Sequence, residues 1–235
     1  MQDLGSAFAL ALELVGSGNA DLFEIVGLSL FVSLTATFAA CIIGLPLGAL
    51  LAIGRFPGRG TLTITVNTLM GLPPVVVGLV VYLYLSRSGP LGFLGLLYTP
   101  TAMIIAQTLL IAPIVAALSR QILEDLHNEY AEHFRSLCLT VRQKLAALLW
   151  DARYALATVA LAGFGRAIAE VGAVIIVGGN IDHLTRVMTT AIALETSKGN
   201  LAMALALGIV LLTLALGVNA AVQLVRARAR EAAFV

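Results

Sequence analysis

The chain has 235 residues, of which 60% are hydrophobic and only 11% are charged, and its mean hydropathy is +0.99. An ordinary soluble domain carries about 25% charged residues, so the composition excludes a soluble fold and predicts residence in a membrane. The net charge of +1 gives no reason to expect a nucleic-acid partner.

The N-terminal segment, residues 1–20, contains a short apolar stretch from Leu4 to Val15 with Glu13 inside it. A membrane-crossing helix needs roughly 20 apolar residues, so this stretch is too short to span. We expect it to lie on the membrane as an interfacial helix in contact with lipid. No Lys or Arg precedes it, which disfavours a cleavable signal peptide.

Five apolar runs then predict a transmembrane domain over residues 21–226, followed by a tail at residues 227–235. The predicted spans are residues 25–53, 61–86, 98–118, 154–177 and 199–225. The second contains Leu72-Pro73-Pro74, which should kink or interrupt its helix near the middle. The predicted fold is therefore an all-α integral membrane protein, and its termini face opposite sides because the number of crossings is odd.

The distribution of basic residues predicts which side of the membrane each terminus faces. With the N-terminus outside, the inner segments hold Arg55, Arg59, Arg120, Arg135, Arg142, Lys144, Arg153, Arg226, Arg228 and Arg230. The outer segments hold only Arg87, Arg186 and Lys198. This positive-inside bias predicts that the N-terminus is outside and the C-terminus is cytoplasmic.

Residues 120–153 form the largest predicted cytoplasmic feature. They contain neither proline nor glycine, and apolar residues such as Ile122, Leu126, Tyr130 and Phe134 recur at helical spacing. We therefore expect a helical loop. Two interpretations remain open: the loop caps the helix bundle, or its exposed face docks a partner protein.

Several kinds of chemistry have no support in the sequence. There is no GxxxxGK[ST] phosphate loop, so the chain should not hydrolyse ATP by itself. The histidines fall outside the predicted spans, no aspartate lies within one, and HExxH is absent, which argues against an intramembrane protease. Cys41 and Cys138 lie in unlike surroundings and indicate free thiols. We expect no enzyme activity, no bound cofactor and no metal.

One pair of opposite charges lies inside the fourth span. Arg166 and Glu170 are four residues apart, so they share a helix face and can neutralise each other. A charge at the centre of a membrane helix costs about 2.5 to 3.5 kcal/mol and is usually tolerated only toward a bundle interior or an aqueous path. The pair either holds helices together or lines a path or gate. Gly172 and the Gly178-Gly179-Asn180 cluster follow, and such small residues permit close helix approach or a flexible exit.

The stretch GFGRAIAEVGAVIIVGGNIDHLTRVMTTAIALETSKGN, from Gly163 to Asn200, resembles the permease subunits of tungstate-type ABC importers. It is more distantly similar to those for molybdate and sulfate. The resemblance implies a type I importer (MetI-like) core of five helices in a bacterial or archaeal cytoplasmic membrane. It also implies a homodimer with the pore at the subunit interface, two cytoplasmic ABC ATPase subunits that bind ATP and Mg²⁺, and an extracytoplasmic oxyanion-binding protein. The candidate path or gate residues are Arg166, Glu170, Gly172, Gly178, Gly179 and Asn180.

In such families the cytoplasmic loop carries a coupling helix, with the pattern EAAxxxG, that docks into a groove on the ATPase. The register places ATPase-coupling residues at Glu132, Arg135 and Cys138. Here His133 and Phe134 replace the two alanines, and Cys138 replaces the glycine. Because His133 and Phe134 are larger than the family's alanines, the groove on the partner should be roomier.

Other functions remain alternatives to a tungstate importer. A molybdate or sulfate permease would have the same architecture. A passive channel or a secondary carrier is the more distant alternative, and a carrier would usually show inverted repeats, into which five spans do not divide equally.

Overall fold

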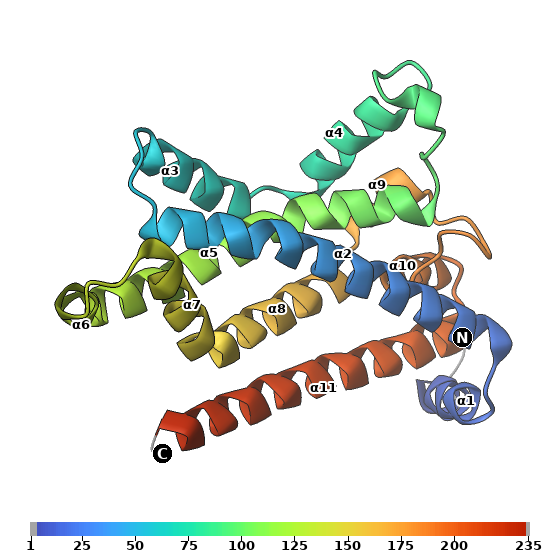
Figure 1. Ribbon diagram of the computed structural model, residues 1–235. Coiled ribbons are helices and arrows are strands. Elements are labelled where there is room, and N and C mark those ends of the chain that lie inside the picture. Colours follow the sequence, from blue (N-terminus) through green and yellow to red (C-terminus); the bar gives the residue numbers. More distant parts are fainter. Residues whose placement is uncertain (1–3, 234–235) are drawn as a thin grey trace. The chain divides into compact units, whose positions relative to one another are not determined.

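The computed structural model describes residues 4–233, and every regular element within them is helical (Figure 1). In chain order the helices are α1 (Leu4–Gly16), α2 (Ala20–Ile53), α3 (Arg59–Met70), α4 (Pro74–Leu85), the 3-10 helix η1 (Gly92–Leu94), α5 (Pro100–Glu129), α6 (Ala131–Ser136), α7 (Val141–Asp151), α8 (Arg153–Ile168), α9 (Gly172–Gly178), α10 (Met188–Ser197) and α11 (Leu201–Ala233).

Three of these helices are long and apolar enough to cross a membrane alone: α2, α5 and the Leu201–Val225 part of α11. The bent pairs α3–α4 and α7–α8 would raise the number to five if each pair forms one span. Helices α2 and α5 continue through Pro46 and Pro113. Prolines are tolerated in membrane helices because neighbouring groups satisfy the backbone carbonyl that each proline leaves without a partner.

The interruption predicted at Leu72-Pro73-Pro74 is confirmed. Helix α3 ends at Met70, and the backbone N–H groups of Gly71 and Leu72 donate to the α3 carbonyls of Thr68 and Leu69. Helix α4 begins at Pro74, a position where the missing N–H costs nothing because the first turn of a helix has no acceptor for it. Two prolines at the start of α4 therefore prevent α3 from continuing.

The chain separates into two compact units, and α2, α5, α8 and α11 each contribute to both. Unit 1 comprises Met1–Ala36, Pro73–Gln107 and Gly165–Val218. Unit 2 comprises Thr37–Leu72, Thr108–Phe164 and Asn219–Val235. Since the candidate path residues fall in unit 1 and the candidate coupling residues in unit 2, each set has its own structural setting.

In unit 2, α2 packs against α5 through two glycines spaced four apart. A Cβ on Gly44 would lie 2.8 Å from the Ala112 carbonyl oxygen, and one on Gly48 would lie 2.7 Å from the Ala116 carbonyl oxygen. Only hydrogen fits at these positions, so the two backbones approach as in other small-residue helix contacts.

In unit 1, α4 packs against α9. A Cβ on Gly78 would lie 2.8 Å from the Cα of Ala173, and one on Gly172 would lie 2.9 Å from Cγ2 of Val75. The close helix approach expected at Gly172 is therefore present, with α4 as the partner.

Candidate functional site

The predicted fourth span is divided at Ala169–Val171, between α8 and α9, and Glu170 lies inside this break. Its Oε2 accepts a hydrogen bond from Arg166 Nη1 at 2.6 Å, in the last turn of α8. Its Oε1 accepts from the backbone N–H of Ala173 at 3.2 Å, in the first turn of α9. A carboxylate at a helix N-terminus is favourable because the N–H groups there lack intrahelical acceptors. One side chain thus links the end of α8 to the start of α9.

Two further side chains hold the backbone of the break. Gln107 of α5 donates from Nε2 to the Ala167 carbonyl at 3.1 Å. Thr189 of α10 donates from Oγ1 to the Glu170 carbonyl at 2.8 Å. A carbonyl released at a helix break is costly in a membrane without a donor. These bonds therefore stabilise the break.

Arg166 and Glu170 differ sharply in exposure. The Glu170 side chain is 4% exposed, whereas the Arg166 side chain is 41% exposed. The Glu170 carboxylate accepts two hydrogen bonds inside the protein, whereas part of the Arg166 side chain is exposed on the surface. If an anion approaches this pair, it meets the arginine.

The other candidate path residues lie at the far end of α9. Gly179 ends the helix with a φ of +72°, and a Cβ there would lie 2.8 Å from Cδ1 of Tyr98. Asn180 also has a left-handed φ of +51°, and its Nδ2 donates to the Thr190 carbonyl at 3.3 Å. The small-residue cluster thus forms a tight turn against neighbouring backbone. The structure brings Arg166, Glu170 and Gly172 together at one end of α9, and it places Gly178, Gly179 and Asn180 at the other.

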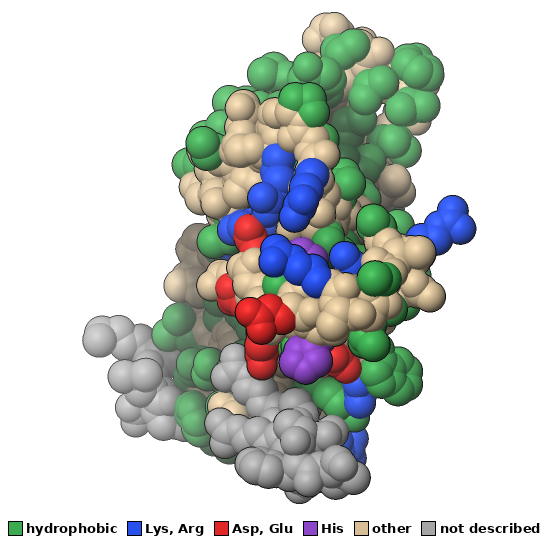
Figure 2. Space-filling model, turned by 60° about the vertical axis from the view of Figure 1, so that its left-hand side comes forward, with side chains coloured by type: hydrophobic (Ala, Val, Ile, Leu, Met, Phe, Trp, Pro, Cys, Tyr) green, Lys and Arg blue, Asp and Glu red, His purple; other side chains and the backbone are tan. Residues whose placement is uncertain are grey.

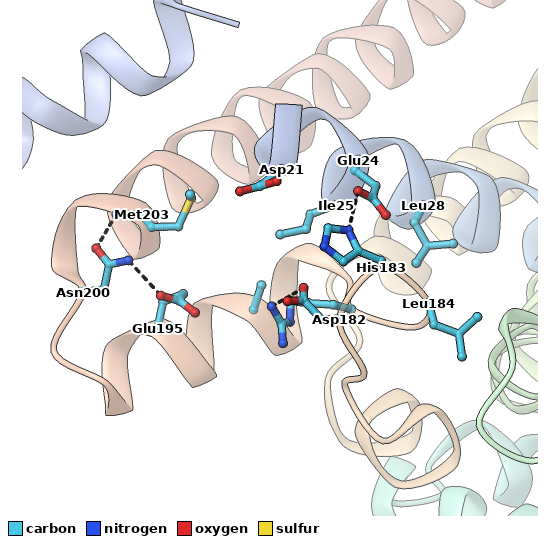
Figure 3. Close-up of a pocket in the computed structure, with 12 residues that line it drawn as sticks. Asp21, Glu24, Ile25, Leu28, Asp182, His183, Leu184, Glu195, Asn200 and Met203 are labelled. Carbon is cyan, nitrogen blue, oxygen red and sulfur yellow. Dashed lines mark hydrogen bonds and ion pairs between the residues drawn. The ribbon is translucent and has the colours of Figure 1, made fainter. Parts of the chain in front are cut away.

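An acidic cavity lies elsewhere in unit 1 (Figure 3). It has a volume of about 230 Å³ between the start of α2, the loop after α9, α10 and the start of α11. Four carboxylates line it, with one arginine and one histidine: Asp21, Glu24, Asp182, Glu195, Arg186 and His183. An acidic lining repels an anion, so this cavity is a poor candidate for oxyanion binding.

Several of the charged residues that line this cavity form ion pairs. His183 Nδ1 lies 2.9 Å from Glu24 Oε2, and this hydrogen bond and the Glu24 charge raise the pKa of His183 above its ordinary value. The hydrogen bond from Lys198 lowers the pKa of Glu195. Among the described residues, no three His, Cys, Asp or Glu side chains form a group able to hold a metal ion.

The predicted coupling segment, in unit 2, is helical, as expected, and it is anchored from within. Helix α6 lies between the ends of α5 and α7 (Figure 1). Phe134 is buried, with its ring centroid 6.1 Å from that of His127 and 5.8 Å from that of Tyr130. Phe134 therefore points into the protein, and it gives no reason to expect a roomier partner groove. The prediction of a roomier groove therefore rests on the exposed His133 alone.

The remaining coupling residues lie on the surface. Glu132, Arg135 and Cys138 are exposed, and Cys138 has a left-handed φ of +49°. Two apolar side chains next to them, Leu137 and Val141, are 66% and 70% exposed. Unit 2 also carries basic residues, and Figure 2 shows Lys and Arg side chains gathered on one face of the molecule. Arg59 and Arg120 both pair with Glu124 of α5.

Sequence inspection missed the residues that hold the break. Gln107 is an isolated amide in an apolar run, and Thr189 follows the predicted path residues by nine positions or more. A lone amide inside an uncharged span is the signal that was available, because a buried polar group there needs a partner. Thr189 and Thr190 offered no comparable signal.

Residues 44–231 match the family described as "Binding-protein-dependent transport system inner membrane component". The chain is 41% identical, over 94% of its length and 97% of the relative's, to the tungstate uptake system permease protein TupB of Peptoclostridium acidaminophilum. It is 43% identical, over 85% of its length and 88% of the relative's, to a probable anion ABC transporter permease protein of Haloferax volcanii.

More distant relatives include the molybdenum transport system permease protein ModB of Azotobacter vinelandii, 28% identical over 71% of this chain and 77% of that protein. Among solved structures, the fold is similar to inward-facing conformations of the MetNI methionine ABC transporter. That likeness has a TM-score of 0.72 and 22% identity, and it covers 88% of this chain and 95% of that one.

These similarities confirm the expected all-α type I importer fold and the resemblance to tungstate-type ABC permeases. They also agree with the weaker resemblance to molybdate permeases. The matched family extends over most of the sequence, including α5, the α8–α9 break and the predicted coupling segment. The chain therefore belongs to the family of inner membrane components of binding-protein-dependent transport systems.

Proposed function

We propose that this chain is the membrane-spanning subunit of an ATP-driven importer whose cargo is the oxyanion tungstate. The observation that carries the substrate is the 41% identity, over nearly the whole length of both proteins, to a tungstate uptake permease. The lower identity to a molybdenum permease favours tungstate over molybdate. ATP is hydrolysed by separate cytoplasmic ATPase subunits, since the sequence has no phosphate loop.

The subunit works as a homodimer that alternates between outward and inward access, and an extracytoplasmic binding protein delivers the oxyanion. The N-terminus is outside and the C-terminus cytoplasmic, as the distribution of basic residues favours. The subunit crosses the membrane five times, as in the predicted spans, and the fourth crossing runs through α8, the break and α9 rather than through α7 and α8.

Reconstitution tests this function. With the partner ATPase and binding protein in proteoliposomes, ATP should drive uptake of radiolabelled tungstate more efficiently than uptake of molybdate or sulfate. The subunit alone should show neither ATPase activity nor uphill uptake. Preferred uptake of molybdate or sulfate would show that tungstate is not the main substrate. Concentrative uptake by the subunit alone would contradict the proposal that it is part of an ATP-driven importer.

Arg166 is the residue of this site that faces the oxyanion, and Glu170 positions it. The support is the contrast between a half-exposed guanidinium and a buried carboxylate in one pair. Arg166→Gln keeps a hydrogen-bond donor for Glu170 and removes the charge. We expect the variant to assemble normally while tungstate uptake falls at least about tenfold, which corresponds to roughly 1.4 kcal/mol. Unchanged uptake in a well-assembled variant would remove Arg166 from the path.

The exposed side of α6 and the following turn contact the ATPase. The support is a helix anchored inward by Phe134 with Glu132, Arg135 and Cys138 left on the surface. In a Cys41→Ala background, Cys138 should crosslink to a cysteine placed in the ATPase groove of the assembled complex. If no position from Glu132 to Val141 crosslinks, the segment is only a cap.

A further inference from the structure

A small second cavity in unit 1 lies against the α8–α9 break. Its lining comes from α2, α5, the end of α8, the break and the region where α10 begins: Ser29, Val32, Ser33, Gln107, Ala167, Ile168, Glu170, Val187 and Thr189. Its volume is about 10 Å³, which is enough for one water molecule. The lining mixes hydroxyl, amide and backbone groups, so the cavity is polar enough to be hydrated.

One atom of this lining lacks a partner. Gln107 is 3% exposed, and its Oε1 is buried without a hydrogen bond from any described residue. Its other amide atom, Nε2, donates to the Ala167 carbonyl. Turning the amide over would set two acceptors against each other at Ala167, so the assignment follows from the hydrogen bonding.

Two hydroxyl groups of the lining, those of Ser29 and Thr189, do not donate to Gln107 Oε1. Ser29 Oγ donates to the Ile25 carbonyl at 2.7 Å and accepts from the Met188 N–H at 2.8 Å. Thr189 Oγ1 donates to the Glu170 carbonyl. Both hydroxyl groups already donate to backbone carbonyls. A buried acceptor without a partner lowers the stability of the fold by about 1–3 kcal/mol. The cavity therefore calls for an external donor.

The kind of partner that Gln107 Oε1 needs also excludes an anion as the ligand of this cavity. Gln107 Oε1 is an acceptor, a deprotonated oxyanion offers only acceptors, and the Glu170 carboxylate lies beside the cavity. We propose that this cavity binds a single water molecule that donates to Gln107 Oε1 and to a second oxygen of the lining. The water completes the attachment of α5 to the α8–α9 break, which Gln107 already holds through Ala167.

A structure of the assembled transporter in nanodiscs, at a resolution that shows ordered water, tests this site. We expect one peak about 2.7–3.2 Å from Gln107 Oε1. An empty cavity, or a Gln107 amide rearranged onto a protein donor, would overturn the proposal. So would a peak about 2.3–2.6 Å from several oxygens, because those distances are typical of a hard cation.

A matched pair of variants tests the role of Gln107. Gln107→Met keeps the length of the side chain and removes the acceptor, so the peak should be lost. Gln121→Met changes an exposed glutamine of the same helix, and the peak should remain. A peak that persists in Gln107→Met would contradict the assignment. If Gln107→Met does not assemble, the peak in the unaltered protein decides alone.

Discussion

The two helix breaks within predicted spans are held in different ways. Between α3 and α4, Pro73 and Pro74 interrupt the helix by their covalent structure, since neither ring can donate a backbone hydrogen bond. Between α8 and α9 there is no proline. That break is held by Glu170 together with Gln107 and Thr189, which are 60 and 19 residues from their acceptors. A proline break is a property of the local chain, whereas the α8–α9 break depends on tertiary contacts and on one charge pair.

The largest expected effect comes from removing the charge that links the two helices. Glu170→Leu leaves Arg166 without its partner and Ala173 N–H without its acceptor. Removing one partner of a buried pair typically lowers the free energy of unfolding by about 3–5 kcal/mol. Because Arg166 is half exposed, we expect a loss of about 3 kcal/mol for this variant. Thermal unfolding in detergent and the membrane level of the protein measure the loss.

The double variant Arg166→Met with Glu170→Leu refines this prediction. It should recover part of the loss because no unpaired charge remains, but not all of it, because the first turn of α9 still lacks its acceptor. Full recovery would show that the Ala173 hydrogen bond contributes nothing. Glu129→Leu, at an exposed acidic position of α5, is the control.

The next effect concerns α4, which starts at the proline break and packs on α9. Gly78→Ala places a methyl 2.8 Å from the Cα of Ala173, a backbone atom that cannot move aside alone. Overpacking of this kind typically costs about 1–3 kcal/mol. Gly208→Ala is the control, because a Cβ there meets nothing within 4 Å. Equal unfolding temperatures for both variants would mean that the α4–α9 contact is not tight.

A smaller effect is expected when one hydrogen bond to the break is removed. Thr189→Val has nearly the same shape but no hydroxyl, so the Glu170 carbonyl loses its donor. The cost should be about 1 kcal/mol or slightly more, since the carbonyl is buried. Thr65→Val, at an exposed position of α3, should be nearly neutral. No difference between the two would argue that the break does not need Thr189.

The smallest effect is a pH dependence in the loop that follows α9. His183 has a raised pKa because it hydrogen-bonds Glu24, so its contribution is complete below the unfolded-state pKa of about 6.5. The contribution is lost as the pH rises through the higher folded-state pKa. The unfolding midpoint of the unaltered protein should therefore exceed that of His183→Gln most at about pH 5.5 and match it at about pH 9.

The control is Asn128→Gln, at an exposed position without a titratable group, which should show no such trend. A difference that grows toward alkaline pH would have the wrong sign for this pair.

The coupling segment shows why sequence comparison can misjudge a substitution. Replacing a small family residue by Phe134 suggested a larger partner groove, but helical periodicity also places position 134 in line with Leu126 and Tyr130 on the apolar face. The structure buries this ring against His127 and Tyr130. Periodicity within the chain predicted the side-chain direction better than the change in residue size did.

Sequence alone determined the membrane character of the chain, its helical class, the proline break and the isolated pair Arg166 and Glu170. These follow from local properties: hydropathy over a span, the missing N–H of proline and the four-residue spacing of a helix. Only the tertiary structure decided that Glu170 is buried while Arg166 stays half exposed, and that Gln107 and Thr189 hold the break between α8 and α9. Those contacts join residues far apart along the chain, so their pairing depends on how helices pack, which no local pattern specifies.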